Sequence, residues 1–63
     1  MLTKREKEVL ELIIQGLNNS EIAKRLKITK HTAKAHASSI YEKLGVTNRV
    51  QATVKYLSIV DEE

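Results

Sequence analysis

Basic side chains gather in the middle of this sequence. Residues 27–36, KITKHTAKAH, contain three lysines and two histidines but no acid, and the other side chains there are small or β-branched. From Ile22 to Tyr41 there are five Lys or Arg residues and no Asp or Glu, whereas all eight acids lie outside this window. Because lysine binds phosphates and the acceptor groups of guanine, the pattern favours a polyanionic partner. The alternative is a basic helix face that is merely solvated.

The two histidines, His31 and His36, raise the question of a metal site. Five residues along a helix separate two side chains by roughly 140°, whereas ligands on one helix face need a spacing of three or four residues. We therefore expect no metal and no cofactor, and we interpret His36 as either a partly buried helix residue or a phosphate donor. Helix capping is a sufficient explanation for Glu6. A chain of 63 residues is small for a catalytic cleft, so we expect no enzyme.

Length and composition predict a single domain, residues 1–63. The chain has a net charge of +3 and no cysteine, so its stability depends on packing rather than on disulfides. Its longest apolar run, Leu12 to Ile14, is far below the roughly 18 residues that a membrane span needs, and polar residues follow Met1, so we expect neither a membrane span nor a signal peptide. We expect a cytoplasmic protein that does not bind membranes.

Capping signals predict two helices in the first half of the chain. Thr3 and Glu6 have the spacing of a capping box, and Gly16 is a typical residue just beyond a helix C-terminus, so a helix is expected at about residues 3–16. A short helix capped by Asn19 or Ser20 should follow at about residues 20–27. The apolar periodicity predicts that these helices bury Val9, Leu10, Ile13 and Leu17, and then Ile22, Ala23 and Leu26.

Two further helices are predicted in the second half. Thr29 can cap a helix over about residues 30–44, which Gly45 ends. Thr47 or Asn48 opens a helix over about residues 48–60, with Asn48 and Gln51 spaced for reciprocal capping. The acidic tail after Val60 should fray. In the third helix the core stripe is Ala33, Ala37, Ile40 and Leu44. The predicted fold class is therefore all-α, a compact four-helix domain that contains a helix-turn-helix unit.

The helix-turn-helix prediction depends on residues spaced five apart around the turn. Ala23 is small where the two helices must cross, the Ile28 side chain fills the turn, and Ala33 again faces the core. Many such units have a glycine in the turn, where this chain has Lys27, and lysine adopts a left-handed conformation less readily. In a unit of this kind the second helix enters the DNA major groove.

Projection of residues 30–44 at about 100° per residue separates an inner face from an outer face. The outer face is small in the middle and basic at its edges, as a recognition helix requires for close approach to base edges. His31, Ala35 and Ser38 point away from the core, with Lys30 and Lys34 on one flank and Thr32 and Lys43 on the other.

The whole chain resembles the LuxR/FixJ/NarL-type (GerE-like) helix-turn-helix domain, a DNA-binding output module of bacterial response regulators. The resemblance is carried by LTKREKEVLELIIQGLNNSEIAKRLKITKHTAKAH, by IYEKLGV and by NRVQA. It implies a four-helix domain of a bacterial transcription regulator, with the third helix in the major groove and the fourth helix in dimerisation. TAKAH corresponds to the family's TVK-x-H signature, with Ala33 where valine is usual.

The resemblance, together with the projection, assigns roles to single residues. The expected base-facing residues are Lys34, Ala35, Ser38 and His31, and the expected DNA-backbone contacts are Lys30, Thr32, Lys43 and His36. The fourth helix has two lines of apolar side chains. One line is enough to pack against the core, so the other is left without a partner in the domain. Val50, Val54 and Leu57 are therefore the expected dimer interface.

The expected partner is double-stranded DNA with an inverted-repeat operator, bound by a weak homodimer that DNA strengthens. The sequence is compatible both with a small stand-alone regulator and with an output domain that follows a receiver or ligand-binding domain. The rival hypothesis is a protein-interaction module of the same fold that binds a partner regulator rather than DNA. Groove binding would weaken steeply with salt, which distinguishes the two.

Overall fold

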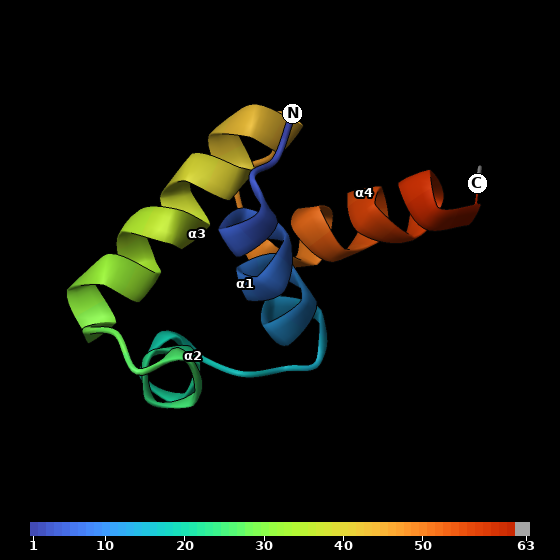
Figure 1. Cartoon of the computed structure of the whole chain (residues 1–63). Coiled ribbons are helices and arrows are strands. Elements are labelled where there is room, and N and C mark those ends of the chain that lie inside the picture. Colours follow the sequence, from blue (N-terminus) through green and yellow to red (C-terminus); the bar gives the residue numbers. More distant parts are fainter. Residues whose placement is uncertain (62–63) are drawn as a thin grey trace.

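Four helices make up the computed structural model, which describes residues 1–61 (Figure 1). They are α1 (Lys4–Ile14), α2 (Asn19–Leu26), α3 (Lys30–Leu44) and α4 (Arg49–Asp61), and none of the residues in the described range forms a strand. The all-α class and the four-helix order predicted from the sequence are confirmed. Of the acidic tail after Val60 that was predicted to fray, Asp61 is the last residue of α4, and Glu62 and Glu63 lie outside the described residues.

Helix α1 begins and ends as its sequence predicts. The Thr3 hydroxyl accepts the Glu6 N–H at 3.1 Å, and the Glu6 carboxylate accepts the Thr3 N–H at 2.8 Å, which completes the capping box. Gly16 follows the C-cap with φ +97°, a conformation that suits glycine.

The predicted N-cap of α2 is wrong by one or two residues. Asn18, not Asn19 or Ser20, caps the helix: its Oδ1 accepts the Glu21 N–H at 2.9 Å, and Glu21 accepts the Asn18 N–H at 2.8 Å. A capping box requires the cap and the acid to be three residues apart, and only Asn18 has that distance from Glu21. Asn19 is instead the first residue of the helix.

The ends of α3 follow the prediction, whereas the start of α4 differs in part. Thr29 caps α3 and Gly45 ends it with φ +73°. At α4, Asn48 accepts the Gln51 N–H at 2.9 Å as expected. Gln51 does not return a bond to Asn48, because its side-chain oxygen accepts the N–H and the hydroxyl of Thr47 at 2.9 and 3.1 Å.

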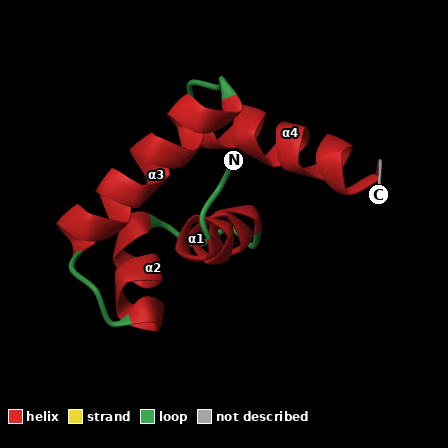
Figure 2. Ribbon diagram, turned by 45° about the horizontal axis from the view of Figure 1, so that its top comes forward, coloured by secondary structure: helices red, strands yellow, loops and turns green. Residues whose placement is uncertain are grey.

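The core lies where α1 meets the other three helices. Figure 2 shows α1 nearly end-on between α3 and α4, with α2 against the N-terminal half of α3. Small residues on α3 and α4 let the helices approach closely, since Ala33 and Ala52 are fully buried. The buried apolar residues are Val9, Leu10, Leu12, Ile13, Ile22, Ala23, Ala33, Ala37, Ile40 and Ala52. Of the predicted stripes, Leu17, Leu26 and Leu44 are only half-buried, at the edge of this core.

The arrangement leaves α3 as an outer edge of the molecule. Helix α3 runs along one side, α2 covers only its first turns, and α4 projects away from its far end (Figure 1). The long side of α3 that faces away from α1 is therefore available to a partner.

None of the helices described for residues 1–61 is long and apolar enough to cross a membrane.

Candidate nucleic-acid interface

The outer face of α3 is small in the middle, as the projection predicts. His31, Lys34, Ala35 and Ser38 are all exposed. The opposite side of the same helix is packed into the core through fully buried Ala33 and Ile40. The four residues predicted to face base edges therefore share one exposed surface, and none of them supports the core.

The N-terminal end of α3 is held by its own cap. The Thr29 hydroxyl accepts the Thr32 N–H at 3.0 Å and donates to the Thr32 hydroxyl at 2.9 Å. This pair fixes the direction in which the chain enters the helix. Because the first turn carries no acid and the N-terminus has a partial positive charge, this end suits a negatively charged partner.

The turn between α2 and α3 positions the outer face of α3. Lys27 adopts a left-handed conformation with φ +58° and ψ +45°, and its N–H donates to the Ala23 carbonyl. The Ile28 N–H donates to the same carbonyl at 3.0 Å, while the Ile28 side chain packs partly buried against the core. Two hydrogen bonds to one carbonyl thus close the C-terminal end of α2, without the glycine that is common in such turns.

The predicted backbone-contact residues lie on both flanks of the outer face. Lys30 is exposed on one flank, next to Lys34. Thr32 and His36 are half-buried on the other flank, so His36 combines partial burial with an accessible edge. The two flanks of a helix in the major groove face the two DNA backbones, so these side chains lie where phosphate contacts are expected.

Lys43, the fourth predicted backbone contact, has a partner within the protein. Its ammonium group donates to Glu6 Oε1 at 2.8 Å, and 37% of the side chain is exposed. The Ser39 hydroxyl donates to the other oxygen of Glu6 at 2.7 Å. Lys43 therefore connects α3 to α1 with one N–H, and two N–H groups remain for a phosphate.

Glu6 has more than the capping role predicted for it. The residue is only 5% exposed, and hydrogen bonds from Lys43, from the Thr3 backbone and from Ser39 lower the pKa of its carboxyl group from 4.5 to about 2. Its ion pair with Lys43 joins residues 37 positions apart, which capping alone does not explain. Glu6 precedes the buried Val9 and Leu10 by three and four residues, and residues at this spacing lie on the same face of a helix. The sequence therefore contained a signal that Glu6 lies on the inner face of α1.

Helix α4 exposes the line of apolar side chains that was predicted not to pack against the core. Val50, Val54 and Leu57 are 70%, 63% and 50% exposed, whereas Ala52 on the other line is fully buried. Val50 and Val54 also border a shallow surface hollow that begins at Gly45 and Val46. Three exposed large apolar side chains therefore lie in a row on α4, a feature typical of interaction surfaces.

In the described part of the chain, no group of three or more His, Cys, Asp or Glu side chains lies close enough together to hold a metal ion. His31 and His36 lie on different sides of α3, the first exposed and the second half-buried.

Comparisons with known proteins point to one family. The model of the bacterial regulatory proteins of the luxR family matches residues 1–56. The chain is 44% identical to the spore germination protein GerE of Bacillus subtilis over 63 residues, which is the whole chain and 85% of GerE. It is 47% identical over 53 residues to the nitrate/nitrite response regulator protein NarL of Escherichia coli, where the match covers 84% of this chain and 24% of NarL.

A solved structure has the same arrangement of helices. The DNA-binding domain of the response regulator ComA, crystallised with the anti-activator RapF, matches with a TM-score of 0.85 at 34% identity. The match covers 87% of this chain and 95% of that one.

Proposed function

The chain belongs to the luxR family of bacterial regulatory proteins, and we propose that α3 binds an operator through the DNA major groove. Members of this family are transcription regulators that bind DNA, and the chain is a domain of that kind. The observation that carries the groove assignment is the exposed face of α3, which combines small side chains in the middle with lysines at its edge.

We assign the base contacts to Lys34, Ala35, Ser38 and His31. The exposure of all four supports this assignment, and their chemistry covers different bases. Lysine donates to the acceptors of guanine, alanine contacts the thymine methyl group, and serine donates or accepts. The small Ala35 between them lets the helix backbone approach the base edges.

Backbone contacts are assigned to Lys30, Thr32, His36 and Lys43. Lys30 is exposed, and Thr32 and His36 each keep a partly exposed side chain on the opposite flank. Lys43 combines this role with its ion pair to Glu6. Such contacts set the register of a protein on DNA without selecting a sequence.

We propose that two copies bind one operator and meet through Val50, Val54 and Leu57. The exposure of these three side chains supports the interface, because burial against a second copy would remove their apolar surface from water. The patch is small, so the free dimer should be weak and DNA should supply the second binding event at high local concentration. A two-fold dimer requires an inverted repeat with half-sites about one helical turn apart.

A protein-interaction module is the second candidate function. The ComA domain in the matched structure is complexed with the anti-activator RapF, so a domain of this fold can be held by another protein. Membership of a DNA-binding family argues against protein binding as the sole role of this chain.

The salt dependence of binding separates the two candidates. Affinity for a selected duplex and for a scrambled duplex is measured by fluorescence anisotropy over a range of salt concentrations. Groove binding predicts a preference for the selected duplex and a log–log slope of about −0.9 for each phosphate neutralised. Equal binding to both duplexes with no salt slope would contradict DNA binding and favour the interaction module.

A further inference from the structure

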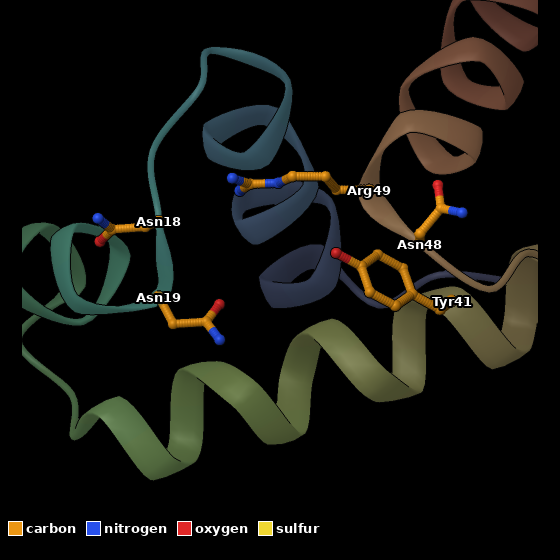
Figure 3. Close-up of a pocket in the computed structure, with 5 residues that line it drawn as sticks. All are labelled: Asn18, Asn19, Tyr41, Asn48 and Arg49. Atoms are coloured by element: carbon orange, nitrogen blue, oxygen red, sulfur yellow. The ribbon is translucent and has the colours of Figure 1, made fainter.

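A polar pocket lies between the starts of α2 and α4, beside α3. It is lined by Asn18 and Asn19 at the start of α2, Tyr41 of α3, and Asn48 and Arg49 at the start of α4 (Figure 3). Asn19 projects from α2 toward the side of Tyr41, and Arg49 extends from α4 toward Asn18 (Figure 3). Its volume of about 340 Å³ is at the small end of the range for ligand pockets, so it suits a small group.

Hydrogen-bond donors dominate the lining of this pocket. Asn18 and Asn48 each use the side-chain oxygen to accept a helix N–H at 2.9 Å, so what remains of each amide is its NH₂ group. Arg49 donates from one guanidinium nitrogen to the Leu17 carbonyl and has further N–H groups. None of the five lining residues is acidic. A cluster of donors with one positive charge selects an anion.

The position of the pocket identifies the source of the anion. Tyr41 follows Lys34 by seven residues, two turns and about 10 Å along the same side of α3. The pocket therefore continues the flank that carries Lys30 and Lys34. One DNA backbone must run along this flank when α3 lies in the groove, because the groove is only about 12 Å wide.

We propose that this pocket binds a backbone phosphate of the operator, with Asn19, Tyr41 and Arg49 as donors. The inference rests on the proposed groove binding by α3. It adds a phosphate site to the backbone contacts already assigned to the lysines of α3. It places contacts from α2, α3 and α4 on one phosphate, which fixes the orientation of the whole domain on DNA rather than that of α3 alone.

Asn19→Asp tests the pocket with a change of one charge. An acid in the first turn of a helix is favourable, so the variant should melt no lower than the wild type, whereas a carboxylate in the pocket repels phosphate. Gln51→Glu is the matched control: it makes the same amide-to-acid change in the first turn of α4, and Gln51 does not line this pocket. Arg49 is left unchanged because it also binds the Leu17 carbonyl.

Affinity is measured by anisotropy on a single selected half-site, where dimerisation plays no part. We expect Asn19→Asp to weaken binding about tenfold or more and Gln51→Glu by less than about twofold. Tyr41→Phe, which removes only the hydroxyl group, should weaken binding about threefold. All three variants should keep the wild-type base preference, since phosphate contacts carry no sequence information.

Two further measurements identify the phosphate. In the first, each backbone phosphate of the half-site is replaced in turn by a neutral methylphosphonate. At one position the replacement should remove the contact itself, so that Asn19→Asp causes no additional loss of affinity there. NMR titration with inorganic phosphate should shift the Asn19 and Tyr41 signals in the wild type, whereas the Tyr41 signals should not shift in Asn19→Asp.

The possible results separate this inference from the function on which it rests. Wild-type protein without base-selective binding would contradict the proposed function itself. Selective wild-type binding with equal losses for Asn19→Asp and Gln51→Glu would overturn the pocket alone. Phosphate-induced shifts without any methylphosphonate position that cancels the Asn19→Asp effect would mean that the pocket binds free anions, which also overturns the DNA assignment.

Discussion

Replacing Lys27 by glycine should stabilise the domain. Lys27 has φ +58°, and it is the one residue other than glycine with a positive φ among residues 1–61. A left-handed conformation costs an L-residue about 1–2 kcal/mol, whereas glycine adopts it without that penalty. The Lys27 side chain is exposed, and its backbone N–H, which donates to Ala23, is kept in the variant.

The expected gain is the relief of strain less the entropy that glycine adds to the unfolded chain, about 0.4–1 kcal/mol. At the midpoints of these two ranges the net stabilisation is about 0.8 kcal/mol, which for a domain of this size raises the melting temperature by roughly 3–6 °C.

Thermal unfolding followed by circular dichroism at 222 nm measures the effect. Lys27→Ala is the control, because it removes the same charge and side chain but keeps the Cβ atom that causes the strain. Lys27→Gly should melt above both the wild type and Lys27→Ala. Equal melting temperatures for the glycine and alanine variants would refute strain in the turn.

Three further predictions concern DNA contacts, assembly and acid stability. Lys34→Ala should relax base preference at one position of the half-site at a cost of about 1–3 kcal/mol; an equal loss on every duplex would contradict a base contact. Leu57→Asp should leave the monomer folded and half-site binding intact but abolish cooperative binding to the paired site, and persisting cooperativity would exclude the α4 interface. The folded pKa of Glu6, about 2, lies below its usual 4.5, so ionised Glu6 contributes its full stabilisation above pH 4.5 and loses it as the pH falls through about 2. Glu6→Gln should therefore lower the melting temperature at pH 7 and flatten its fall between pH 5 and pH 2, and a curve parallel to the wild type would contradict this role.

The helices and the outer face of α3 were predictable because they depend on short-range patterns. The Thr3–Glu6 and Thr29 caps, the glycines after α1 and α3 and the apolar periodicity all act within one or two helical turns. The α2 cap was misplaced because Asn18, Asn19 and Ser20 are all good capping residues, and the decision depends on the reciprocal bond from Glu21. The same spacing rule, applied here as at Thr3, selects Asn18.

Contacts between distant segments were not predictable in the same way. The ion pair from Glu6 to Lys43 and the pocket that brings Asn19 together with Tyr41 and Arg49 depend on how the helices cross. Periodicity places a residue on a face of its own helix, but it does not say which residue of another helix lies opposite. Lys43 therefore looked like a free basic side chain, although a buried carboxylate holds it.

Selection of bound sequences from a random duplex pool tests the central claim most directly. If α3 lies in the major groove and the domain binds as a two-fold dimer through α4, the selected sequences should share an inverted repeat with half-site centres about 10 base pairs apart. The wild-type Lys34 should specify at least one base pair in each half-site, and this preference should disappear in a parallel selection with Lys34→Ala. A pool that stays random after repeated rounds, or a common motif that Lys34→Ala leaves unchanged, would contradict sequence recognition by α3.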